Sequence, residues 1–72
     1  MELNDILIVQ LKEEFGGSKY RGKFIKSTIN DLIIDNVEIY RYKHWKSLDA
    51  TAYIPHRFIS YVKKVNDDDS NE

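Results

Sequence analysis

The sequence predicts a mainly β fold, a small five-stranded barrel followed by a short acidic tail. Short apolar and β-branched runs are separated by turn residues, and the 72-residue chain contains no cysteine that a disulfide or thiolate metal site would need. A chain of this size buries only about 60% of its unfolded surface, which favours a closed sheet and self-association. We therefore predict one β-barrel domain over residues 1–65 and a disordered acidic tail over residues 66–72.

The first element allows two interpretations. Apolar residues within residues 3–15 fit a helical stripe that would end at Gly16 and Gly17, and they also fit the alternation of a strand. Because the glycine turn leads directly into a second β-rich run, we favour a strand over Ile6–Glu13 and another over Lys19–Ile25.

The remaining strands are marked by β-branched residues between turn signals. The third is too long to stay flat throughout, and proline is expected to end the fourth because it lacks a backbone donor. The predicted segments are a turn at Asn30 and Asp31, a strand over Leu32–Tyr40, a polar connection over Lys43–Leu48, a strand over Ala50–Ile54 ended by Pro55, and a last strand over Phe58–Val65.

Charge is distributed unevenly along the chain. The net charge is −1, from 11 Lys and Arg against 12 Asp and Glu. Four of the acids lie in the tail, so residues 1–65 carry 11 − (12 − 4) = +3. A mildly basic middle beside an acidic tail is a usable pattern, although most charge of this kind only solvates a surface. The acidic residues of the tail are Asp67, Asp68, Asp69 and Glu72.

Several functional classes lack the residues they need. His44 and His56 are the two histidines, and with no cysteine they do not make up a metal-ligand set, so no metal or cofactor is expected. Neither a nucleophile elbow nor a glycine-rich phosphate loop is present, so we expect no enzyme. The apolar run Ile6–Leu11 is too short to span a membrane and the N-terminus is acidic, so we expect a cytoplasmic protein without a membrane partner.

The segment from Tyr40 to Lys46 is the best candidate for binding. It alternates cations with aromatic residues, an arrangement in which cations meet phosphates and rings stack on bases. Packing of the aromatic residues on the barrel, with exposed cations, would explain the same pattern, and Trp45 could instead anchor a protein contact. The predicted nucleic-acid-binding residues are Arg41, Tyr42, Lys43, Trp45 and Lys46.

The first strand is apolar on both faces. In the strand interpretation Ile6 and Ile8 point away from Leu7 and Val9, so one apolar pair faces away from the core. Either a neighbouring copy of the chain covers this pair or the preceding turn folds over it, and we predict the first, an interface formed by Ile6 and Ile8.

The first two predicted strands and the turn between them resemble those of a known family. The alternating strand Ile6–Lys12, the glycine turn and the run Tyr20–Phe24 resemble the first half of the Sm-like barrels, the family of the Sm, LSm and Hfq proteins. Asp35–Glu38 and Ile59–Val62 extend the resemblance. Membership would imply a closed ring of subunits with RNA bound near its pore.

Parts of the sequence differ from that pattern. Thr28 and Leu32 occupy positions where the family's first motif has an acidic residue and an asparagine. The end of the chain, where Pro55 precedes Phe58, is also similar to the proline-containing turn of SH3-like barrels, which are the second fold the sequence allows. We expect a non-catalytic, homo-oligomeric RNA-binding module, and the alternative is a protein-interaction or structural module without a nucleic-acid role.

Overall fold

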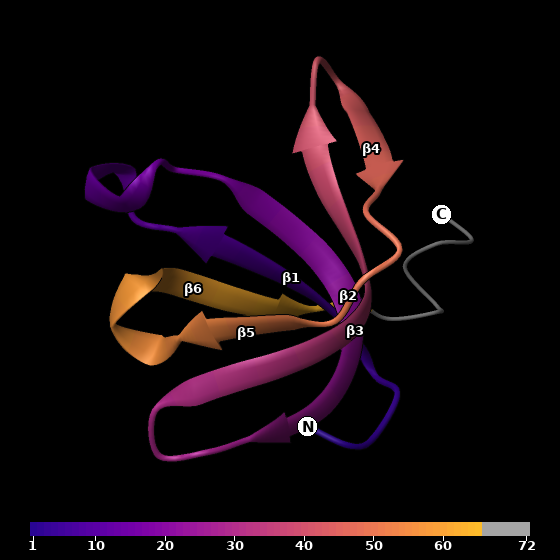
Figure 1. Cartoon of the computed structure of the whole chain (residues 1–72), viewed down its shortest axis with the longest axis vertical. Coiled ribbons are helices and arrows are strands. Elements are labelled where there is room, and N and C mark those ends of the chain that lie inside the picture. Colours follow the sequence, from indigo (N-terminus) through magenta and orange to yellow (C-terminus); the bar gives the residue numbers. More distant parts are fainter. Residues whose placement is uncertain (66–72) are drawn as a thin grey trace.

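The chain forms one strongly curved antiparallel sheet, seen in a computed structural model that describes residues 1–65 (Figure 1). The predicted disordered tail, residues 66–72, lies outside the described residues. The elements are β1 (Ile6–Leu11), η1 (Glu13–Phe15), β2 (Lys19–Ser27), β3 (Asp31–Arg41), β4 (His44–Ser47), β5 (Ala52–Pro55), η2 (His56–Phe58) and β6 (Ile59–Lys64). The mainly β prediction is confirmed, and the first element is a strand.

The sheet curls at its long strand β3, which pairs with two different strands along one of its edges. The strand order is β4-β3-β2-β1-β6, and β5 also pairs with β3. The first half of β3 pairs with β5 and its second half pairs with β4. Between the two halves, Asn36 has a φ of 50°, and the pairing of β3 with β2 shifts register in the same region. These irregularities bend the strand, as its length predicts.

Gly22 lets β2 and β3 approach closely at this bend. A Cβ atom at position 22 would lie 2.8 Å from the backbone oxygen of Asp35 and 3.1 Å from Cδ1 of Ile34. Real Cβ atoms do not approach backbone oxygen so closely, so a side chain here would push the strands apart. The absence of a side chain at Gly22 therefore permits the curvature.

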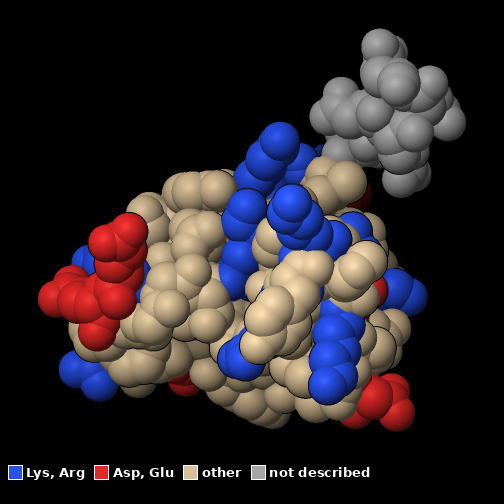
Figure 2. Space-filling model, turned by 90° about the horizontal axis from the view of Figure 1, so that it is seen from above, with Lys and Arg blue, Asp and Glu red and all other residues tan. Residues whose placement is uncertain are grey.

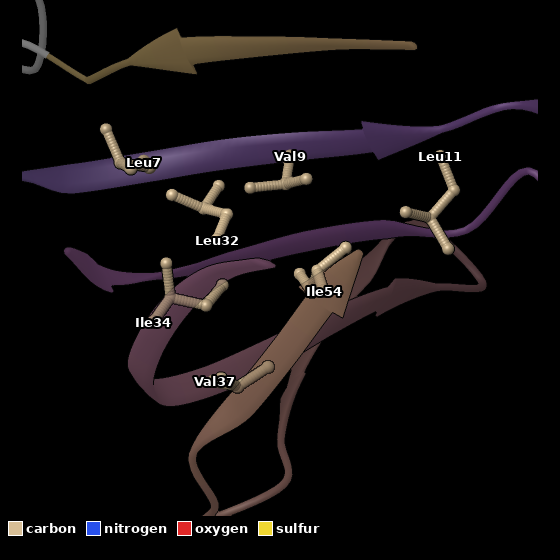
Figure 3. Close-up of a cluster of buried hydrophobic side chains, with 7 residues drawn as sticks. All are labelled: Leu7, Val9, Leu11, Leu32, Ile34, Val37 and Ile54. Carbon is tan, nitrogen blue, oxygen red and sulfur yellow. The ribbon is translucent and has the colours of Figure 1, made fainter. Parts of the chain in front are cut away.

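The inner face of the curved sheet holds the core. On β1, alternate residues point inward and are buried, while the residues between them are half-buried on the outer face. Burying a Leu, Ile or Val side chain contributes about 1.5–3 kcal/mol, so this cluster is the main source of stability. Its buried members, drawn in Figure 3, are Leu7, Val9, Leu11, Leu32, Ile34, Val37 and Ile54.

The strand count and several predicted boundaries were wrong. The sheet has six strands, because the segment predicted as a connection over Lys43–Leu48 contains β4. The first strand ends at Leu11, and η1 follows it. The strand predicted over Ala50–Ile54 begins at Ala52, and it ends at Pro55 as expected, with Pro55 as its last residue directly before η2.

None of the described residues forms a helix long and apolar enough to span a bilayer.

Candidate nucleic-acid interface

The hairpin of β3 and β4 carries the predicted binding segment away from the barrel (Figure 1). Its two-residue turn consists of Tyr42 and Lys43, whose φ angles are 51° and 67°. Positive φ at both central residues is the geometry that matches the twist of a tight hairpin. This conformation usually requires Gly, Asn or Asp, which explains why the sequence did not predict the turn.

The strand register divides the predicted binding residues between two faces. Tyr40 lies opposite Trp45, and Ile39 lies opposite Lys46. Because side chains alternate along a strand, Trp45 and Lys46 point to opposite sides of the hairpin. Lys46 shares its side with Arg41, whereas Tyr42, 92% exposed, and Lys43 form the tip. The five predicted residues therefore share one element, but they do not form one surface.

A cluster around Trp45 covers the outer side of the hairpin. The guanidinium carbon of Arg21 lies 4.4 Å from the centre of the Trp45 ring system, and the Tyr40 ring centre lies 5.1 Å away at a tilt of 58°. The Nε of Arg21 donates a hydrogen bond of 2.7 Å to Oε1 of Glu38. This bond, with the Arg21 charge beside it, lowers the pKa of the Glu38 carboxyl, and partial burial opposes the shift.

Arg21 and Lys19 are site residues that sequence reasoning did not select. Both lie on β2, about twenty residues before the hairpin, and the Lys19 Nζ lies 5.5 Å from the centre of the Tyr40 ring. The available signal was their spacing, because residues two apart on a strand share a face. Their contact with the hairpin depends on the β2–β3 register, which no local pattern specifies.

Ile6 and Ile8 lie on the same outer face, between cations. Lys23 is the β2 neighbour of Ile6, and Arg21 is that of Ile8. Ile8 also lies opposite Lys63 on β6. Both isoleucines are half-buried, and an interface over them would have to remove the neighbouring cations from water, which is costly. The interface assignment of Ile6 and Ile8 stays a prediction.

Cations gather at the hairpin end of the molecule. Figure 2, viewed from that end, shows Lys and Arg over the middle of the surface and a group of Asp and Glu at its left edge. From Ile39 to Leu48 the sequence has three Lys and Arg residues and no acidic residue. This end therefore presents local positive charge, although the whole chain has a net charge of −1.

An apolar groove of about 480 Å³ lies beside β5. The stacked rings of Phe15 and Phe58, whose centres are 4.2 Å apart, line one part of it. Leu48 and Tyr53 also line it and are 44% and 66% exposed. Within residues 1–65, β5 pairs with β3 alone and β6 with β1 alone, so each strand has one unpaired backbone edge.

His56 joins two loops. Its Nε2 lies 2.9 Å from the carbonyl oxygen of Thr28 and 3.1 Å from Oγ of Ser27, and its backbone nitrogen donates to the Asn30 carbonyl. These contacts attach η2 to the β2–β3 loop. Residues 1–65 contain no group of three or more side chains that could hold a metal ion.

Comparison with known proteins gives structural matches without sequence matches. No protein-family model and no curated protein sequence matches the chain. The SmAP1 heptamer of P. aerophilum matches with a TM-score of 0.76 and 12% identity, covering 89% of this chain and 82% of that one. A heptameric archaeal Sm protein, described in relation to the eukaryotic snRNP core, has the same score, 12% identity and coverage of 89% and 90%.

A third similar structure comes from a different assembly. A chain in the NatC complex bound to CoA matches with a TM-score of 0.71 and 17% identity, covering 96% of this chain and 84% of that one. Identities this low define a fold alone. The chain has the Sm-like fold, seen here as the strongly curved antiparallel sheet described above.

Proposed function

We propose that this chain is a non-catalytic binding module that self-associates and binds RNA through the β3–β4 hairpin. The observation that carries the RNA assignment is the projecting hairpin, which bears Arg41, Lys43 and Lys46 and has Tyr42, 92% exposed, at its tip. Cations near a phosphate backbone gain affinity by releasing counterions. An exposed ring among them adds a surface on which a base can stack.

The unpaired strand edges support self-association. The edge of β6 in one copy can extend the sheet along the edge of β5 in the next, which places Val62, 37% exposed, close to the apolar groove. Such a contact joins two different surfaces, so repeating it gives a ring when the rotation closes. Two Sm structures that are similar in fold are both described as heptameric.

The experiment compares the RNA affinity of two triple variants, each of which removes three positive charges, one in the hairpin and one outside it. The triple variant Arg41→Gln, Lys43→Gln, Lys46→Gln should weaken binding at least about tenfold and flatten the dependence of log K on log salt by about 2, since each lost contact to a single strand removes about 0.7. The matched control changes Lys12, Lys26 and Arg57 to Gln, which lie outside the hairpin. If both triple variants lose the same amount of RNA affinity, binding depends on net charge alone and the hairpin is not the site.

The mass of the purified protein tests self-association in the same samples. Light scattering should give a multiple of the 8.5 kDa chain, and Val62→Asp should reduce it, because the charge would be buried against the apolar groove. If Ile8→Asp reduces the mass and Val62→Asp does not, the predicted outer-face interface is the correct one.

A protein-interaction module is the second candidate function. The specific observation in its favour is the similarity to a chain that works within the NatC complex, together with the exposed apolar groove beside β5. A monomer that copurifies without nucleic acid, and that binds no RNA at low salt, would favour this candidate over the first.

A further inference from the structure

We infer that the outer face of the sheet stacks unpaired bases, so that the RNA ligand is single-stranded and runs from the hairpin across the sheet. This inference rests on the proposed function, because it extends the hairpin site. It assigns a binding role to Tyr40, Lys19 and Tyr61, which the sequence did not select as site residues.

The residues involved form one row across five strands. Tyr40 lies directly opposite Trp45 in the sheet, and Gln10 lies opposite both Lys19 and Tyr61. The contact of Lys19 with the Tyr40 ring connects these two groups of neighbours. All of them therefore point to the outer face. We call Trp45, Tyr40, Lys19, Gln10 and Tyr61 the aromatic row.

The spacing of the row suits an extended nucleic-acid strand. Neighbouring strands lie about 4.8 Å apart, so Tyr40 on β3 and Tyr61 on β6 are separated by about 14 Å, three strand spacings. Lys19 lies between them and can meet a phosphate. Sheets with aromatic residues on one face bind RNA in this way, with two or three bases stacked on the rings.

Two rings of the row are partly exposed to solvent and do not contribute to the core. Tyr40 is 40% and Tyr61 is 49% exposed, on the face of the sheet opposite the core. Trp45 is held by Arg21 and Tyr40, which fixes its orientation before any ligand arrives. Fixed, partly exposed rings lose little freedom when a base stacks on them.

The charge around the row favours phosphate over an acidic protein as the partner. The row contains a cation and no acid, and the neighbouring Glu38 is neutralised by Arg21 at 2.7 Å. An acidic protein surface would meet the cations but would leave the aromatic rings unused. Because a nucleic acid strand supplies both phosphates and flat apolar bases, it fits both features.

Trp45 provides a direct measurement, since it is the one tryptophan of the chain. An unstructured RNA of about 12 nucleotides, within the usual site sizes, should quench its fluorescence on binding at low salt. An RNA duplex of the same charge and inorganic polyphosphate should quench it much less, because neither offers free base faces. Equal quenching by the duplex would overturn the single-stranded assignment.

Tyr61 tests the far end of the row with a matched pair of variants. Tyr61→Leu keeps the apolar bulk and removes the ring, so single-stranded RNA should bind at least about fivefold more weakly, the lower end of a lost stacking contact. Tyr61→Phe keeps the ring and should bind like the unchanged protein. Light scattering on both variants shows whether assembly is preserved, and the Trp45 signal does not depend on either substitution.

The outcomes separate this inference from the proposed function. If RNA binding needs the hairpin cations but leaves Trp45 fluorescence and Tyr61→Leu affinity unchanged, the aromatic row is not a binding surface and the proposed function stands. If no RNA binds at low salt, both are wrong. If polyglutamate binds with the same dependence on Tyr61, the row recognises acidic chains and the inference is overturned.

Discussion

Arg21 links packing and charge at the scale of single residues. Its guanidinium lies over the Trp45 ring and its Nε bonds to Glu38, so one side chain fixes the neighbours on β3 and β4. The Arg21 and Glu38 side chains are 32% and 30% exposed. Solvent screens a pair of this kind, which contributes about 0–1 kcal/mol to folding. Its larger role is to hold Trp45 in place.

The lowered pKa of Glu38 makes a small part of stability depend on pH. A carboxyl whose pKa is lower in the folded protein contributes fully above its ordinary unfolded value, about 4.3, and its contribution is lost as pH falls through the folded pKa. We expect the stability difference between the unchanged protein and Glu38→Gln to be constant near neutral pH and to shrink below about pH 4.3. Urea unfolding at a series of pH values measures it.

A second substitution supplies the control for Glu38. In an Arg21→Gln background the same Glu38→Gln change should show much less pH dependence, because the hydrogen bond from Arg21 is the largest cause of the shift. A pH dependence that persists without Arg21 would contradict this assignment.

At the scale of elements, the sequence predicted the strands that carry the core and missed β4, which carries half of the candidate hairpin site. The alternation of Leu7, Val9 and Leu11 is local, so β1 could be read directly. β4 was missed because Tyr42 and Lys43 give no turn signal. The partners Arg21 and Lys19 come from strand register, which depends on how the whole sheet bends.

The hairpin turn should gain stability and lose binding when it receives favourable turn residues. Tyr42→Asn with Lys43→Gly suits the positive φ angles of 51° and 67°, so we expect stability to rise by about 1 kcal/mol, measured by thermal unfolding. RNA affinity should fall, since the change removes the exposed ring and one cation. A variant that is more stable and binds RNA as well as before would exclude the tip from the site.

At the scale of the whole molecule, the curved sheet keeps three surfaces separate. The inner face is the core, the outer edges of β5 and β6 are unpaired within residues 1–65, and the outer face carries cations and aromatic rings. An edge contact uses backbone groups and leaves the side chains of the aromatic row on the other surface. The proposed self-association and the proposed RNA binding are therefore compatible within one assembly.

The acidic residues at the end of the chain have a charge opposite to that of the proposed RNA surface. Ending the chain at Val65 removes four acids and changes the net charge from −1 to −1 + 4 = +3. We expect the shortened chain to bind RNA more tightly at low salt, because the acids compete with phosphates for the same cations. At about 0.3 M salt the Debye length falls to roughly 5–6 Å, so the two chains should bind alike. Titrations of both chains at both salts measure the effect. Equal affinities at low salt would leave the acids a role in solubility alone.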